Sequence, residues 1–222
     1  MNPTKTILEI RFSSPARQFD FISDIVRALG GTPPADNRNI FLDTRNIGLQ
    51  VSSKKINLLF NASRYVINME EQLDLDEIRK TILDLSARLH SHVHWTSMTR
   101  IGFRTIWTLE VENFEALLEK SKKALFKDHE LITNATDVGL PLTLIDRNSK
   151  VNYLYGPMKK AQLEAIGFEF PLEVPECFAY IDVDYYREPN QQFSEKYLKD
   201  FLRSASSFAT EKVQETRRML GV

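Results

Sequence analysis

Residues 98–111 read MTRIGFRTIWTLEV, and apolar and polar side chains alternate along this stretch. On an extended chain, alternate residues share a face, so one face would carry Ile101, Phe103, Thr105, Trp107, Leu109 and Val111. The opposite face would carry Arg100 and Arg104, with Gly102 between them. The stretch therefore predicts a long strand that is half buried and has a charged outer face.

A second stretch, residues 178–186, shows the same alternation with acidic residues on its outer face. Ile181 and Val183 fall on the apolar side, and Asp182 and Asp184 fall on the other side. If the two strands are neighbours, arginine and aspartate side chains would pair across the sheet.

Outward from these strands, each half of the chain predicts the order strand, helix, several strands, helix. In the first half, the pattern predicts a strand over 4–12, a helix over 17–29, an antiparallel meander over 39–69 and a helix over 75–89. Runs of strands between long helices favour an α+β fold over a doubly wound one. We predict an α+β fold with a largely antiparallel sheet in two topologically similar halves, 1–92 and 93–222, which are either two domains or one.

The second half continues with a helix capped by Asn113 and then a hairpin over 142–155. The hairpin is expected to end at Gly156-Pro157 and to be followed by a short helix over 158–166. Ser194 is placed to cap a long C-terminal helix that reaches about Leu220. Two apolar stripes on this helix indicate contacts on more than one side. We expect a homodimer, and the alternative is a helix that lies across its own sheet.

Composition bounds the class of protein. The chain has 222 residues, 29 Lys+Arg, 30 Asp+Glu and 42% hydrophobic residues, which is typical of soluble globular proteins. The formal net charge of -1 gives no strong signal for nucleic-acid binding. Neither a signal peptide nor an apolar run of about 20 residues is present, so no membrane association is expected. The single cysteine, Cys177, fits a cytoplasmic protein.

Six residues on the outer faces of the two long strands form the candidate binding surface. Arginine and aspartate together with tyrosine suit a binding groove, because a phenol supplies apolar area and a hydrogen bond together. The alternative is that the C-terminal helix covers this face. The candidates are Arg100, Arg104, Tyr180, Asp182, Asp184 and Tyr186.

Metal binding has two weak candidates, and neither is favoured. Asp182 and Asp184 would lie about 7 Å apart on one strand face, a spacing that can hold Mg²⁺ but that also suits a charge ladder. His92 and His94 would share a face if the preceding helix ends at His90 and a strand follows. Phosphate loops, dinucleotide fingerprints, nucleophile elbows and zinc motifs do not occur, so no cofactor is expected.

The segment Met98 to Arg104 resembles the central strand of a sporadically distributed family of uncharacterised prokaryotic proteins. In that family an Arg-x-Gly-x-Arg strand follows a helix near mid-chain, and an Asp-x-Asp strand precedes the last helix. The corresponding residues here are Arg100 to Arg104 and Asp182 to Asp184. The family's aromatic-Ile-Asn is replaced by Thr105-Ile106-Trp107. The resemblance brings no known activity, and it implies a similar fold and a shared Arg/Asp surface only.

Two functional classes follow from these observations. The first is a noncatalytic binding or assembly module. The second is a metal-dependent hydrolase or phosphotransfer enzyme that uses Asp182 and Asp184, with Arg100 and Arg104 on an anionic substrate. Solvent-open carboxylates without arginine partners would favour the enzyme, and paired or covered carboxylates would favour the binding module.

Overall fold

The structure is a computed structural model, and it describes residues 2–13, 38–42, 47–51, 56–61, 63–70, 73–92, 96–126, 130–169 and 175–221. The helix expected over 17–29 lies outside the described residues. Every other element named above falls wholly or largely within them.

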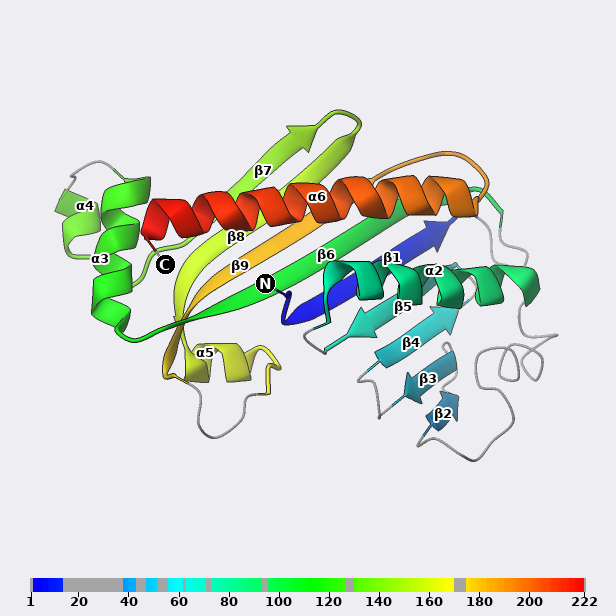
Figure 1. The fold of residues 1–222 in the computed structure, drawn as a ribbon, viewed down its shortest axis with the longest axis horizontal. Coiled ribbons are helices and arrows are strands. Elements are labelled where there is room, and N and C mark those ends of the chain that lie inside the picture. Colours follow the sequence, from blue (N-terminus) through cyan, green and yellow to red (C-terminus); the bar gives the residue numbers. More distant parts are fainter. Residues whose placement is uncertain are drawn as a thin grey trace.

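The strands of the described ranges form one sheet in which all neighbouring strands are antiparallel. Its nine strands lie in the order β2-β3-β4-β5-β1-β6-β9-β8-β7. They are β1 (Lys5–Phe12), β2 (Arg38–Leu42), β3 (Ile47–Val51), β4 (Ile56–Asn61), β5 (Arg64–Met69), β6 (Met98–Val111), β7 (Leu140–Asp146), β8 (Ser149–Lys159) and β9 (Cys177–Arg187). The expected α+β class with an antiparallel sheet is confirmed (Figure 1).

The centre of the sheet joins strands from the two sequence halves. β1 pairs with β6, and Leu8 lies opposite Phe103. The strands of residues 1–92 all lie on the β1 side of this junction, and those of 93–222 lie on the β6 side. The Arg strand β6 and the Asp strand β9 are direct neighbours.

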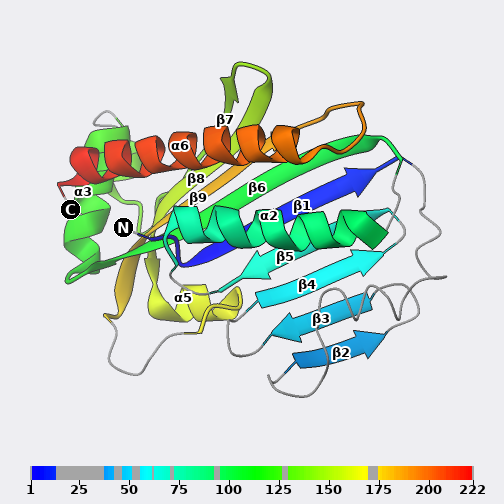
Figure 2. The same cartoon turned by 45° about the vertical axis from the view of Figure 1, so that its right-hand side comes forward.

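Helices occupy both faces of the sheet unequally. The long helices α2 (Leu75–His92) and α6 (Glu195–Leu220) lie side by side across one face (Figures 1 and 2). The other helices in the described ranges are shorter, namely α3 (Phe114–Leu125), α4 (Glu130–Thr133) and α5 (Lys160–Ala165). Among the described helices, none combines the length and apolar character needed to cross a membrane.

Side-chain caps set the helix starts that the sequence predicts. Asp74 accepts hydrogen bonds from the amides of Asp76 and Glu77 at the start of α2. Asn113 accepts one from Ala116, and Ser194 accepts one from Tyr197. Each carboxylate, amide or hydroxyl oxygen satisfies N–H groups that a helix start leaves without a partner.

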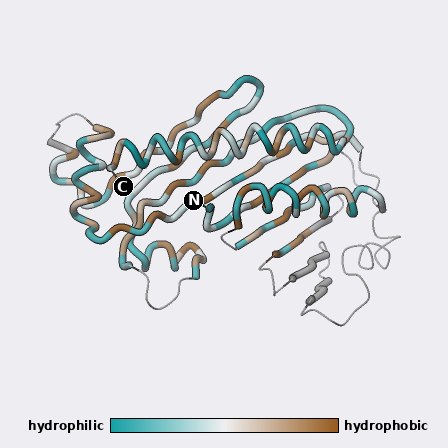
Figure 3. Tube along the Cα trace, viewed as in Figure 1, coloured by the Kyte–Doolittle hydropathy of each residue, from teal (hydrophilic) through white to brown (hydrophobic). Residues whose placement is uncertain are grey.

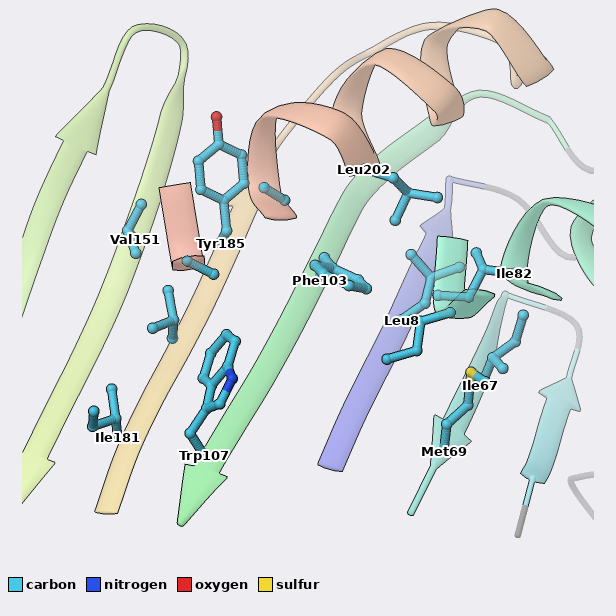
Figure 4. Packing of buried hydrophobic residues seen from close by; sticks show 14 of the residues in the cluster. Leu8, Ile67, Met69, Ile82, Phe103, Trp107, Val151, Ile181, Tyr185 and Leu202 are labelled. Atoms are coloured by element: carbon cyan, nitrogen blue, oxygen red, sulfur yellow. The ribbon is translucent and has the colours of Figure 1, made fainter. Parts of the chain in front are cut away.

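The main core lies between the sheet and the helices α2 and α6. Figure 4 shows Trp107, Phe103 and Leu8 pointing from neighbouring strands to the same side, where Leu202 and Ile82 meet them. Apolar residues recur along the strands and along α6, as Figure 3 shows. The predicted alternation is confirmed: Ile101, Phe103, Trp107 and Ile181 are buried in this core.

The C-terminal helix uses its apolar residues within the chain. Phe201 and Phe208 of α6 pack against Tyr185, and α6 also contacts α2 and α3. The residues that it buries are Leu198, Phe201, Leu202, Ala205, Ser206, Ala209, Val213, Thr216 and Leu220.

The predicted end of the hairpin strand at Gly156-Pro157 is wrong, because β8 continues to Lys159 beside β9. Pro157 is tolerated there because the pairing of β7 with β8 stops at Tyr155, so this end of β8 forms an edge of the sheet. A Cβ at Gly156 would lie 3.1 Å from the carbonyl oxygen of Val138, which explains a glycine at this close approach.

Candidate functional site

The predicted Arg and Asp residues meet on the sheet face opposite α2 and α6, here called the open face. Arg104 lies directly opposite Asp184 in the pairing of β6 with β9. Because Trp107 and Ile181 point to the helices, residues an odd number of positions away point to the open face. The C-terminal helix therefore does not cover this surface.

The strongest contact on the open face runs diagonally across the strands. The Nε atom of Arg104 donates to both carboxylate oxygens of Asp182, at 2.9 and 3.1 Å, and its Nη2 atom also donates to Oδ2. Long side chains can reach such diagonal neighbours across a sheet. This hydrogen bonding raises the pKa of Arg104. The side chain of Asp182 is only 8% exposed. Two nitrogen atoms of the Arg104 guanidinium bind its carboxylate and fix its position.

Arg100 contacts the more distant aspartate, Asp184, beside Gly102. Arg100 Nη2 lies 3.4 Å from Asp184 Oδ2, and the guanidinium lies over the ring of Tyr186 at 4.7 Å. A Cβ at Gly102 would touch both Asp184 and Arg100 at 3.6–3.8 Å. These distances are ordinary van der Waals contacts, so Gly102 lies against the Arg100–Asp184 pair.

Tyr180 is buried and contacts Asp182 with its hydroxyl group. It packs with Ile106, Phe178 and Leu163 of α5, and Phe168 meets it edge-on. Its hydroxyl donates to Asp182 at 3.2 Å, and burial raises its pKa to about 12. The expectation of a tyrosine on the surface therefore fits Tyr186 and not Tyr180.

Asp184 sits at the centre of the open face. It lies between Arg100 and Arg104 and receives a hydrogen bond from Asn152. Burial raises the pKa of its carboxyl above the ordinary value, while the two arginines oppose that shift. Asp184 thus has a partner on β6 and another on β8.

Two cavities open beside this cluster. One of about 250 Å³ is lined by Ile7, Glu9, Val66, Arg100, Gly102, Arg104 and Asp184. The other, about 480 Å³, continues toward the sheet edge and is lined by Arg104, Pro141, Leu142, Thr143, Asn152, Tyr153, Leu154, Asp182 and Asp184. Arg104 and Asp184 line both cavities, so the hollow surface extends from β5 to β7.

The histidines are arranged differently from the metal-site hypothesis. α2 extends through His92, so His92 does not lie on a strand with His94, and that placement is wrong. His94 lies outside the described residues. His90 stacks on Phe193, with ring centroids 3.4 Å apart, and meets Phe12 and Tyr65 edge-on. In the described ranges, no group of three or more His, Cys, Asp or Glu residues is placed to hold a metal ion.

Sequence reasoning missed three residues on the open face: Glu9, Arg11 and Arg64. The first two were on the polar side of the predicted strand at 4–12, and Arg64 immediately precedes a predicted strand. Only the register of β5, β1 and β6 shows that Arg64 lies opposite Arg11 and that Arg11 lies opposite Arg100.

Comparisons with known proteins identify neither a family nor a function for the chain. No family model and no curated protein matches the chain. Among solved structures, Methanococcus jannaschii TBP is matched with 11% sequence identity and a TM-score of 0.31, over 91% of this chain and 98% of that chain.

Proposed function

We propose that the chain is a noncatalytic binding module whose ligand occupies the open face. The observation that carries this proposal is the pairing of Arg104 with Asp182 and of Arg100 with Asp184, beside two cavities that no long helix covers. Paired charges hold their side chains in place before a ligand arrives, and preorganised groups lose less entropy on binding.

The enzyme alternative would use the same two aspartates as metal ligands or bases. The oxygens of Asp182 already accept hydrogen bonds from Arg104 and Tyr180, and Asp184 is shared by Arg100 and Asn152. A bound cation would have to displace these donors. The arrangement therefore favours binding over metal-assisted hydrolysis.

The binding module is tested by obstructing the open face at a residue outside its ion pairs. Thr143 is exposed on β7 and lines the larger cavity, and Ser207 is exposed on α6 at the helical face. A library of polar metabolites and short peptides is screened for compounds that raise the melting temperature of the wild-type chain. We expect such a shift to disappear in Thr143→Arg and to persist in Ser207→Arg.

Two results would contradict the proposal. One is a stabilising compound whose effect survives Thr143→Arg and is lost in Ser207→Arg, which would place binding on the helical face. The other is Mg²⁺- or Mn²⁺-dependent hydrolysis of a phosphate ester that Asp184→Asn abolishes, which would support the enzyme.

Assembly, compartment and family are separate proposals. We propose a homodimer in the cytoplasm and a relationship to the prokaryotic family with the Arg-x-Gly-x-Arg strand. The exposed positions of α6 are mostly polar, which favours another surface for the dimer contact. Light scattering during size exclusion gives the mass: twice 25.7 kDa supports the dimer, and a single chain mass removes it.

A further inference from the structure

The strand β7 lies at one end of the sheet, and among the described strands it pairs with β8 alone. Figures 1 and 2 show the β7–β8 hairpin projecting beyond α6, so neither of the two long helices lies along the outer edge of β7. An unpaired strand edge offers its N–H and C=O groups to a further strand.

The turn of this hairpin determines which backbone groups of β7 point outward. Asp146 pairs with Ser149 across the two-residue turn Arg147-Asn148. Residues that flank such a turn exchange both backbone hydrogen bonds, and the direction of bonding alternates along an antiparallel strand. Every second residue from Asp146 therefore bonds to β8, and the residues between them face away from it. Thr143 and Ile145 thus direct an N–H and a C=O outward.

The side chains of this edge are apolar, although native proteins usually protect a strand edge with charged residues. No charged residue occurs from Leu140 to Ile145. Ile145 is 81% exposed and Leu142 is 38% exposed. Pro141 lacks an N–H and offers only its C=O at the outer edge. The strand therefore exposes apolar area together with backbone groups that can pair.

A second copy of β7 fits this edge in the antiparallel direction, with Thr143 on a two-fold axis. The N–H of each Thr143 then donates to the carbonyl oxygen of the other, and the N–H of each Ile145 donates to the carbonyl oxygen of Pro141 in the other copy. Leu142 meets Leu144 of the second copy on the helical face, and Ile145 meets Pro141 on the open face. Each contact occurs twice, as in other two-fold interfaces.

The charges beside β7 agree with this register. Asp146 lies opposite Leu140 of the second copy, so like charges do not meet. Arg147 is exposed at the turn and lies opposite Gly139 of the second copy, near its exposed Asp137. The chain thus supplies a matching strand and opposite charges for its own edge, which favours a second copy over an unrelated peptide.

We infer that two copies of the chain pair through β7 and form a homodimer with one continuous sheet. This inference rests on the homodimer proposed above and names its interface. The pairing also joins the two open faces, because Pro141, Leu142 and Thr143 line the larger cavity at this edge. The larger cavities of both copies lie beside the two-fold axis.

The first test removes an outward N–H while leaving the pairing of β7 with β8 intact. Thr143→Pro eliminates the donor at the axis in both copies. We expect the dissociation constant of the dimer, measured by sedimentation, to rise about 10- to 100-fold. Thr143→Val is the matched control, because it keeps the N–H and a β-branched side chain, and it should dimerise like the wild type. Circular dichroism compares the folds of the variants.

A second pair of variants tests the apolar contact. Ile145→Asp places a charge against Pro141 of the second copy, and light scattering should give the mass of a single chain. Ile166→Asp is the control, because Ile166 is 56% exposed at the end of α5, far from β7 (Figure 1). This variant should keep the mass of the dimer.

Two results would overturn the inference. One is a wild-type chain that stays a monomer in concentrated solution. The other is a dimer that both Thr143→Pro and Ile145→Asp leave intact, which would place the dimer contact on another surface. A monomeric wild type that still shows the ligand-dependent shift in melting temperature would remove the β7 contact and retain the binding module. A β7 dimer without any such shift would do the reverse.

Discussion

At the scale of single residues, the open face combines buried and exposed charges whose roles differ. Asp182 is almost fully covered, whereas its partner Arg104 is 44% exposed. A covered carboxylate depends on its donors, because leaving it without them costs the desolvation of a charge. Residue chemistry predicted this Arg–Asp pairing from two alternating stretches. It did not predict which aspartate each arginine contacts. Arg104 lies opposite Asp184 but binds Asp182, because a long side chain extends diagonally across the paired strands.

Arg104→Met should lower the free energy of unfolding by about 1–3 kcal/mol, since Asp182 would lose its guanidinium while staying covered. The exposure of Arg104 keeps the loss below that of a fully buried pair. Urea denaturation gives the value. Lys150→Met is the control, because the pair of Lys150 with Glu188 is exposed on both sides and its removal should change stability by less than about 0.5 kcal/mol. Similar losses in both variants would contradict this account.

Burial in an aromatic cluster lowers the pKa of His90 from 6.5 to about 3. Below pH 6.5 the unfolded chain takes up a proton at this position and the folded chain does not, so stability falls as the pH drops from 6.5 toward 3. Among the described residues, the rings of Phe12, Tyr65 and Phe193 contact it.

His90→Phe keeps a ring in this cluster and removes the titration. The variant should therefore show a flatter loss of stability between about pH 6.5 and pH 5, above the range in which most carboxylates titrate. Denaturation curves of wild type and variant at several pH values check this. A wild-type slope that persists unchanged in the variant would assign it to other groups.

At the scale of elements, the spacing of apolar residues and the helix-capping residues predicted most of the strands and helices. The strands over 39–69, the central strand at 98–111 and the final helix agree with the structure within a few residues. Gly156-Pro157 was misinterpreted because proline excludes a strand only where its missing N–H would have been paired. The pairing of β1 with β6 could not be predicted, since local pattern does not specify which distant strands become neighbours.

The cap of α6 gives a direct test at this scale. Ser194→Ala should lower the free energy of unfolding by about 1 kcal/mol, because the amide of Tyr197 loses its acceptor at 3.2 Å. Ser207→Ala, at an exposed position within the same helix, should be neutral or slightly stabilising, since alanine has the higher helix propensity. Thermal or urea unfolding of the two variants compares them, and an equal effect would argue against the cap.

At the scale of the whole molecule, the sheet and its main core extend across both sequence halves. Leu8 of β1 and Phe103 of β6 are cross-strand partners in one buried cluster. The halves were predicted from the repeated order of elements, but their shared core depends on long-range packing that composition and spacing do not reveal.

Leu8→Ala should therefore weaken both sides of the sheet at once. The cavity that it leaves is expected to cost about 2–5 kcal/mol. In a Trp95→Phe background, Trp107 fluorescence reports on β6, and far-UV circular dichroism reports on the whole chain. We expect both signals to shift together in urea. Separate transitions would show that the two halves unfold independently.

Both long helices lie on one side of the sheet, so side chains on that face are constrained by packing and many on the other face are not. Changes on the helical face alter packing and are constrained by it. Exposed positions on the other face, such as Arg11, Arg64, Thr143 and Asn152, contribute little to the core. The residues that would contact the proposed ligand can therefore change there during evolution, or by laboratory selection, while the packing of the scaffold stays the same.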